Sequence, residues 1–419
     1  MLFKPNKIFF LIILIFVFFS ISCIPVQATG NLIKVQKRPL SWFLKRAEET
    51  LKVYLLNQDL NKANAISKQV KARRWPRIGL TLGHGWEDWN SNYNFLTPTI
   101  SGPFLEIIRN RYRIKAADEN VKIEKSKIHY FMNQQKLKIA QLYFNILQQQ
   151  IKKEILTISL ITNKKIYQLY SQLDEPIYRS KIFELETKIL NLSQSLLSIQ
   201  TKLQSNIFKL QDLLDLNEPI LPEGGKGEFY YEIPNDFIKK SIEQSFMLKI
   251  YKVKKEICKQ NFLLSKAERF PKPFIEMGTA QFRSEPSVWI GVTMPIFTGG
   301  EISSRIQEQR IKCQKVQTQY VLAQRYIIKK GKEILKQVNF AHQALSLSKQ
   351  DYYHQVNLLK EMKKLFKLKA VGKDKILKQE SLVKISELKS KEKEYQLEAI
   401  LFKAYQFYNG FDDGFINEN

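Results

Sequence analysis

Hydrophobic and polar positions follow the same plan twice along this chain, about 192 residues apart. In each half, a stretch with helical spacing leads to two short alternating stretches and then to two long stretches with helical spacing. The halves span residues 29–216 and 236–410, residues 217–235 link them, and residues 411–419 form a C-terminal tail. A repeat of this size predicts two similar structural halves that share one body.

Each half contains one predicted pair of strands. The strands are expected over residues 77–85 and 94–102, and over residues 274–282 and 287–294. Pro98 weakens the second strand, because proline removes a donor from the hydrogen-bond ladder. A single helix is predicted before each pair, over residues 39–74 and 236–269.

Four long helices follow the strand pairs, and they are predicted over residues 103–172, 177–216, 302–370 and 375–408. At 1.5 Å per residue, the longest would extend about 100 Å. Antiparallel neighbours of this length pack as coiled coils. On the second of these helices the inward positions are expected to be Phe183, Ile189, Leu190, Leu196 and Leu203.

The predicted fold is mostly α with a small β part. Four strands of eight or nine residues cannot close a barrel, and a bilayer tolerates no unpaired sheet edge. We therefore expect several chains to pool their strands into one shared transmembrane β-barrel, which makes the protein a cyclic oligomer. The helices leave the strands from one side and would continue the barrel as a hollow helical cylinder, so the assembly would be a conduit.

The N-terminus has the pattern of an export signal. Lys4 and Lys7 precede an apolar run over residues 8–19 that is too short for a comfortable membrane span. Two processing sites compete: cleavage after Ala28, which removes residues 1–28, and lipidation of Cys23 in a loose lipobox, which removes residues 1–22. Either one directs the mature chain out of the cytoplasm.

The net charge of +27 is extreme. Its simplest interpretation is a solvated lysine-rich surface, and the sharper ones are anionic lipid headgroups, an acidic partner or an anion-favouring channel wall. Nucleic-acid binding is disfavoured, because the chain has no compact basic motif with interleaved aromatics and because it is exported.

The cysteines and glycines indicate no catalytic chemistry. Cys258 and Cys313 fall at similar heights on two predicted antiparallel helices, so a disulfide and two buried thiols both stay open, and thiols are the simpler expectation. No Cys/His spacing suggests a metal site. Gly224-Gly225 and Gly299-Gly300 lack the flanking residues of a phosphate loop. We expect no enzyme, no cofactor and no metal.

Three motifs resemble the TolC-like outer-membrane efflux family. They are the junction from Met294 to Gly300, the stretch from Ile139 to Leu147, and Ala370-Val371-Gly372 followed by Ile376-Leu377. The resemblance covers residues from about 39 to 410. It implies an outer-membrane duct of a Gram-negative bacterium, a homotrimer with a twelve-stranded barrel and a periplasmic helical barrel, serving passive efflux or secretion of small molecules or proteins.

The resemblance also implies partners and sites. The partners are a periplasmic adaptor, an inner-membrane transporter and outer-membrane lipid. Tip turns for docking and gating would be Asp174, Glu175, Pro176, Val371, Gly372, Lys373 and Asp374. Strand-to-helix junctions would be Pro103, Phe104, Pro295, Phe297, Gly299 and Gly300.

Two positions depart from the family pattern. Lys378 and Ser381 stand where well-studied members carry entrance aspartates, and a lysine ring would favour anions. Asp174-Glu175-Pro176 replaces the usual glycine turn. The competing interpretation is a lipid-anchored periplasmic coiled-coil scaffold or adaptor without a pore.

Overall fold

The computed structural model describes residues 36–87, 91–101, 106–172, 178–218, 220–225, 229–279 and 286–410. Residues 37–419 form one compact unit, and the fold described here is that of this unit. The predicted export signal, Cys23 and the C-terminal tail lie outside the described residues. So do Pro103, Phe104, Asp174, Glu175 and Pro176.

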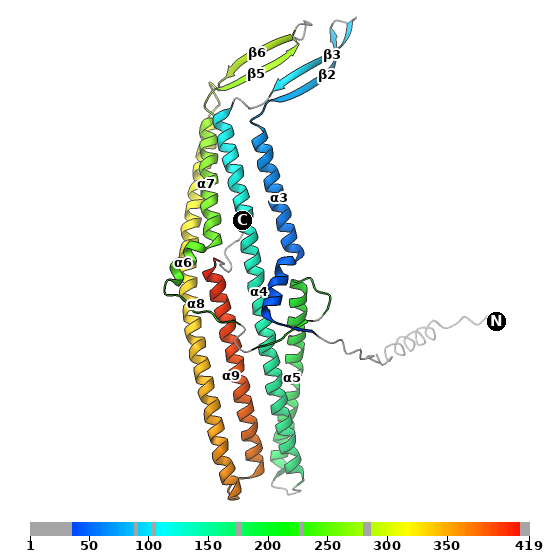
Figure 1. Ribbon diagram of the computed structural model, residues 1–419, viewed down its shortest axis with the longest axis vertical. Helices are drawn as coiled ribbons and strands as arrows, with labels where there is room; N and C mark the ends of the chain where they lie inside the picture. The colour runs from blue at the N-terminus through cyan, green and yellow to red at the C-terminus, as the bar shows by residue number, and fades with distance from the viewer. Residues whose placement is uncertain are drawn as a thin grey trace, which may run out of the picture. The chain divides into compact units, whose positions relative to one another are not determined.

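The two halves repeat one order of elements (Figure 1). The first half contains α2 (Leu40–Arg46), the 3-10 helix η1 (Ala47–Glu49), α3 (Leu51–Ala72), β2 (Arg77–Glu87), β3 (Ser91–Ser101), α4 (Ile107–Ser171) and α5 (Arg179–Leu213). The second contains α6 (Phe237–Gln244), α7 (Phe246–Ala267), β5 (Lys272–Thr279), β6 (Pro286–Thr293), α8 (Glu301–Lys367) and α9 (Lys373–Tyr408). The predicted mostly α fold with two strand pairs is confirmed.

The helix that precedes each strand pair is broken, so the prediction of two continuous helices is wrong. Thr50 has an extended backbone between η1 and α3, and its hydroxyl donates to the carbonyl of Ala47. Asp215, from the far end of α5, accepts the backbone N–H of Leu51 at 2.9 Å and thereby caps α3. In the second half, Ser245 interrupts the chain between α6 and α7 and accepts the N–H of Leu248. Both breaks place a hydroxyl residue at the same point of the repeat.

Each strand pair is an antiparallel hairpin. In the first, Arg77 pairs with Ser101 and Glu87 with Ser91, so both strands are longer than predicted and the connection is shorter. Pro98 lies inside β3 opposite Leu80, where the sequence made a strand doubtful. The second hairpin pairs Lys272 with Thr293. β3 lies beside β5, which brings the two hairpins together at one end of the helices.

The long helices pack in the order α8, α9, α4, α5 (Figure 1). The hydrophobic core is concentrated where the middle of α4 and of α8 meets the C-terminal ends of α5 and α9. Ile139, Tyr143, Phe144 and Ile146 of α4 are fully buried there against α2 and α9. A second core joins α6, α7, α8 and α9 around Phe237. β1 (Gln36–Arg38) and β4 (Ile220–Pro222) form a small sheet of their own.

Cys258 of α7 and Cys313 of α8 form a disulfide, with their Cα atoms 5.5 Å apart. The simpler expectation of two thiols is wrong. The two helices run antiparallel on either side of the second hairpin, so Cys258, 14 positions before β5, and Cys313, 20 positions after β6, meet at one height. A disulfide fits a protein that resides in an oxidising compartment.

Candidate functional site

The strand-to-helix junction of the second half is built around two glycines. Gly299 and Gly300 have φ of +57° and +88°, which glycine adopts without steric cost. The N–H of Glu301 donates to Thr298 and the N–H of Ser304 to Gly300, so α8 starts directly after the turn. Pro295 is half-buried, and Phe297 is 90% exposed on a single protomer.

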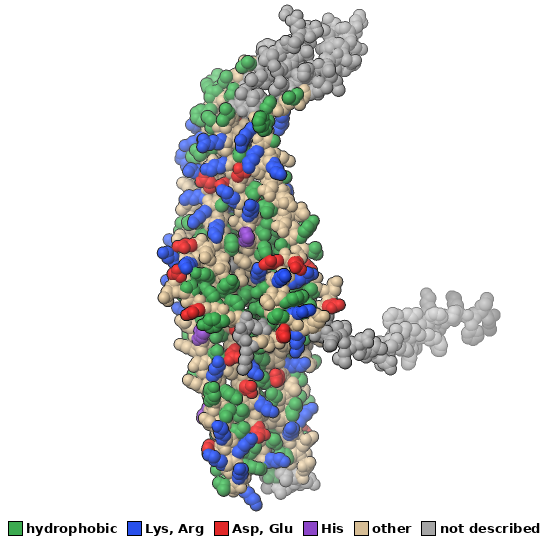
Figure 2. Space-filling model, viewed as in Figure 1, with side chains coloured by type: hydrophobic (Ala, Val, Ile, Leu, Met, Phe, Trp, Pro, Cys, Tyr) green, Lys and Arg blue, Asp and Glu red, His purple; other side chains and the backbone are tan. Residues whose placement is uncertain are grey.

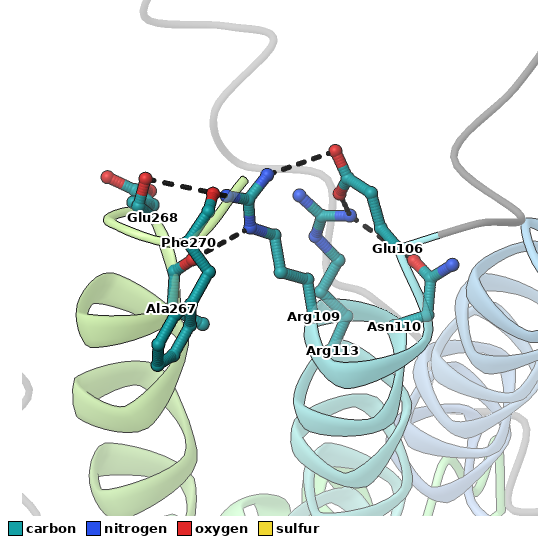
Figure 3. A network of polar contacts seen from close by, with 7 residues as sticks. All are labelled: Glu106, Arg109, Asn110, Arg113, Ala267, Glu268 and Phe270. Atoms are coloured by element: carbon teal, nitrogen blue, oxygen red, sulfur yellow. Dashed lines mark hydrogen bonds and ion pairs between the residues drawn. The ribbon is translucent and has the colours of Figure 1, made fainter. Parts of the chain in front are cut away.

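A buried arginine connects the two halves at the ends of α4 and α7 that lie next to the strands (Figure 3). Arg109, in the first turn of α4, is 4% exposed. Its guanidinium donates to the carbonyls of Ala267 at 3.0 Å and Phe270 at 2.7 Å, at the C-terminal end of α7, and it pairs with Glu106 at 3.1 Å. The Ala267 carbonyl also accepts the N–H of Phe270 at 3.1 Å, so Arg109 supplies it with a second donor. A cation at the C-terminal end of a helix also complements the helix dipole. The arrangement fixes α4 against α7 just below the strands.

The opposite end of the helices carries the turn between α8 and α9. Its left-handed residue is Lys369, with φ of +57°, rather than the glycine of the predicted turn. Gly372 has an extended backbone and precedes the first turn of α9. A Cβ on Gly372 would lie 2.6 Å from Asp374 Oδ1, so a larger residue here would have to displace that carboxylate. Val371, Gly372, Lys373 and Asp374 thus do form the end of this hairpin.

Tyr170 connects the two hairpin ends. It lies in the last turn of α4, and its hydroxyl donates to Asp374 Oδ2 at 3.0 Å. Its ring lies 5.2 Å from that of Tyr178, and the ammonium of Lys181 stands over it at 5.4 Å. Burial and the hydrogen bond to Asp374 both raise the pKa of Tyr170, so the hydroxyl remains a donor at neutral pH. Sequence analysis missed this residue, since one tyrosine among 18 carries no local signal.

Lys378 and Ser381 have different environments. Lys378 is exposed on α9, in keeping with an entrance-lining position. Ser381 is 7% exposed and lines a cavity of about 500 Å³ between α4, α8 and α9. Ser381 is therefore nearly buried within one protomer, and its position at the entrance stays a prediction.

Two helices carry straight rows of exposed apolar side chains. On α5 the row contains Phe183, Leu190, Leu197 and Phe208. On α8 it contains Ile311, Leu322, Phe340, Leu347, Leu358 and Leu365. Neighbours in a row are 7, 11 or 18 positions apart, which is close to a whole number of helical turns. Phe183 and Leu190 were expected to face inward, and that prediction is wrong, because α5 packs on α4 through other positions. α5 and α8 are the outermost helices of the row of four, so these apolar rows lie at its two edges.

Within the described part of the chain, no cluster of three or more His, Cys, Asp or Glu side chains is arranged to hold a metal ion. Among the same residues, no helix combines the length and the apolar character needed to cross a membrane.

The fold defines a structural class: four long helices joined to two adjacent β-hairpins is also the architecture of several outer-membrane channel proteins of known structure. CusC, whose structures concern transmembrane channel formation, superposes with a TM-score of 0.75 and 14% identity over 89% of this chain and 92% of its own. MtrE, an outer-membrane channel of Neisseria gonorrhoeae in its open state, gives 0.72 and 14% over 89% of each chain. VceC, an outer-membrane protein of Vibrio cholerae, gives 0.67 and 15% over 89% and 96%.

The likeness extends over nearly the whole length of these proteins, and it confirms the fold inferred from the sequence motifs. No protein-family model and no curated protein matches the chain. With identities this low, the shared feature is the architecture.

Proposed function

We propose that this protein is the passive outer-membrane exit duct of an efflux or secretion system. The observation that carries the proposal is the pair of hairpins at one end of the helices. In the described residues, β2 pairs only with β3 and β5 only with β6, so each hairpin has two strand edges without hydrogen-bonding partners. Such edges are satisfied when copies join into a closed barrel, which is the arrangement that a bilayer requires.

The apolar rows support a ring of copies. They lie on α5 and α8, at opposite edges of the helical layer, so the α5 edge of one copy meets the α8 edge of the next. Contacts between unlike surfaces close into a ring when the rotation allows it. We propose a homotrimer, in which twelve strands form the barrel and twelve long helices form the duct below it.

The partners in the proposal are a periplasmic adaptor and an inner-membrane transporter. The adaptor would dock on the helix ends around Val371, Gly372, Lys373 and Asp374, because these turns are farthest from the strands. Lys378 would line the entrance. Three copies of an exposed lysine around a narrow opening attract anions and repel cations.

Conductance in planar bilayers tests the duct. The wild-type oligomer is expected to give stepwise single-channel currents with a preference for anions. Lys378→Asp should lower that preference, whereas Lys202→Asp, an exposed lysine on α5, should leave it unchanged. Silence from folded oligomers, persisting after the tips are loosened by Tyr170→Phe, would instead favour the alternative of a lipid-anchored periplasmic scaffold.

Assembly is tested separately by native mass spectrometry in detergent. Phe340→Glu places a charge in the α8 row and should convert trimers to monomers, because an interface that buries this position would have to bury an unpaired carboxylate. Ser346→Glu is the matched control, since Ser346 is exposed about 120° around the same helix. Trimers that persist in Phe340→Glu would contradict the proposed use of this row.

A further inference from the structure

We propose that the end of the helical layer nearest the strands holds a binding site for anionic phospholipid headgroups, in a cleft between α3 and α4. The inference rests on the proposed function only for the direction of the membrane. The α3–α4 cleft has a volume of about 570 Å³ and is lined by Arg74, Ile107, Asn110, Arg111, Ile114, Lys115 and Asp118. Cationic and apolar side chains therefore share one opening.

Two guanidinium groups are available in the α3–α4 cleft. Lys115 is paired with Glu256 at 3.0 Å, and Asp118 is held by Lys71 at 2.7 Å. Arg74 and Arg111 are both exposed, and neither has a side-chain partner among the described residues. Arginine presents a planar fork of donors that matches the oxygens of a phosphate. Ile107 and Ile114 offer an apolar surface to the glycerol and the first methylenes of a lipid.

Arginine is concentrated at this end of the molecule. The segments 63–77, 106–116, 258–272 and 301–310, which meet the strands, contain 9 of the 14 arginines of the chain. They carry 15 lysines and arginines against 4 aspartates and glutamates. On the face drawn in Figure 2, Lys and Arg side chains crowd this end of the helices, with few Asp or Glu among them.

Net charge alone does not distinguish this end, because the opposite end is also basic. Residues 360–378 contain eight lysines but no arginine and no tryptophan. At the strand-proximal end, by contrast, large exposed apolar side chains accompany the arginines: Trp75, Ile78, Ile107, Ile108 and Phe270. Arginine mixed with aromatic and aliphatic side chains is the composition of a membrane–water interface.

The position of the α3–α4 cleft next to the strands favours a lipid, rather than a soluble anion, as its occupant. Arg74 is three residues before β2, and Arg111 is in the second turn of α4. If the strands span the bilayer, these side chains reach the headgroups of the leaflet that faces the helices. A cationic residue near an anionic membrane surface gains about 1 kcal/mol, so two should change lipid affinity by at least tenfold.

Native mass spectrometry of the detergent-solubilised full chain, titrated with phosphatidylglycerol or phosphatidylcholine, tests the site. The wild type is expected to retain phosphatidylglycerol at concentrations at least tenfold below those needed for phosphatidylcholine. The double variant Arg74→Gln/Arg111→Gln should lose this preference. Lys188→Gln/Lys202→Gln removes the same charge from α5, remote from the strands, and should keep it.

Three outcomes would overturn the proposal. The first is equal retention of the two lipids by the wild type, and the second is an unchanged preference in the double variant. The third is complete displacement of phosphatidylglycerol by millimolar inorganic phosphate, which would assign the cleft to free phosphate. The double variant Arg74→Lys/Arg111→Lys is the control for misfolding, because it keeps both charges. It should bind phosphatidylglycerol with an affinity between that of the wild type and that of Arg74→Gln/Arg111→Gln. Conductance is recorded independently, so a failed duct and a failed lipid site are distinguishable.

Discussion

The hydroxyl of Tyr170 and the carboxylate of Asp374 are hydrogen-bonded at 3.0 Å although 204 positions separate them in the chain. The bond joins the end of α4 to the beginning of α9, and therefore couples the tips of the two hairpins within one protomer. An entrance that opens by separating the hairpins would have to break it.

Tyr170→Phe removes the donor and retains the ring. We expect a higher open probability in single-channel recordings, because a hydrogen bond to a charged group contributes about 1.5–3 kcal/mol. Tyr167→Phe is the matched control: its hydroxyl bonds Glu186 of α5 at 3.1 Å, within one hairpin. Equal effects of the two variants would show that the link between hairpins has no special role in opening.

Removal of the disulfide should lower stability without changing the fold. Cys258 and Cys313 are 55 positions apart and enclose the second hairpin. Loss of a cross-link over a loop of this length costs up to about 4 kcal/mol in the chain-entropy model. The double variant Cys258→Ser/Cys313→Ser should melt at a lower temperature. A reductant should destabilise the wild type similarly and should leave the double variant unaffected.

Arg109→Lys tests the joint between α4 and α7. A lysine cannot reach the carbonyls of Ala267 and Phe270 and the carboxylate of Glu106 together, so at least one of these acceptors loses the donor that Arg109 supplies. We expect a loss of about 2–3 kcal/mol in unfolding free energy, measured by denaturation in detergent. Arg113→Lys, whose side chain is 31% exposed, should cost under about 1 kcal/mol. A loss no larger than this for Arg109→Lys would contradict the structural role.

Gly410→Ala should be strongly destabilising. Gly410 has φ of +93°, and a Cβ there would lie 2.2 Å from the carbonyl oxygen of Gln244. Its own carbonyl accepts the N–H of Phe246, so the clash falls at the break between α6 and α7. We expect a loss above about 2 kcal/mol, seen as a lower melting temperature. Gly372→Ala is the contrast, because there a rotation of Asp374 relieves the contact at small cost to stability.

The contact between α3 and α4 should weaken in acid. Burial acts to raise the pKa of Asp118, but hydrogen bonds from Lys71 and Ser67 outweigh it and hold the pKa below the ordinary 3.8. A lowered folded-state pKa means that the stabilisation is complete above the ordinary value and is lost as pH falls through the folded value. Hydrogen exchange of α3 should therefore accelerate below about pH 4 in the wild type. In Asp118→Asn the acceleration should be smaller, and equal acceleration would assign the effect to other carboxylates.

The sequence by itself determined the repeat, the four long helices and the two hairpins. These features depend on hydrophobic period and on local breakers such as Gly299 and Gly300, which act within a few residues. The outward rows on α5 and α8 were also present in the spacing. In the α5 row, Phe183 and Leu190 were predicted to face inward, because a single sequence does not distinguish contacts within a chain from contacts between copies.

Only the tertiary structure decided how distant segments meet. The breaks at Thr50 and Ser245 depend on partners such as Asp215 and Gly410, which lie about 165 residues further along the chain. The disulfide, the buried Arg109 and the pairing of Tyr170 with Asp374 depend on the relative height of neighbouring helices. Helix register is fixed by side-chain packing along the whole interface, and no local pattern encodes it. For the same reason Ser381 is nearly buried within the protomer while Lys378, less than one turn away, is exposed.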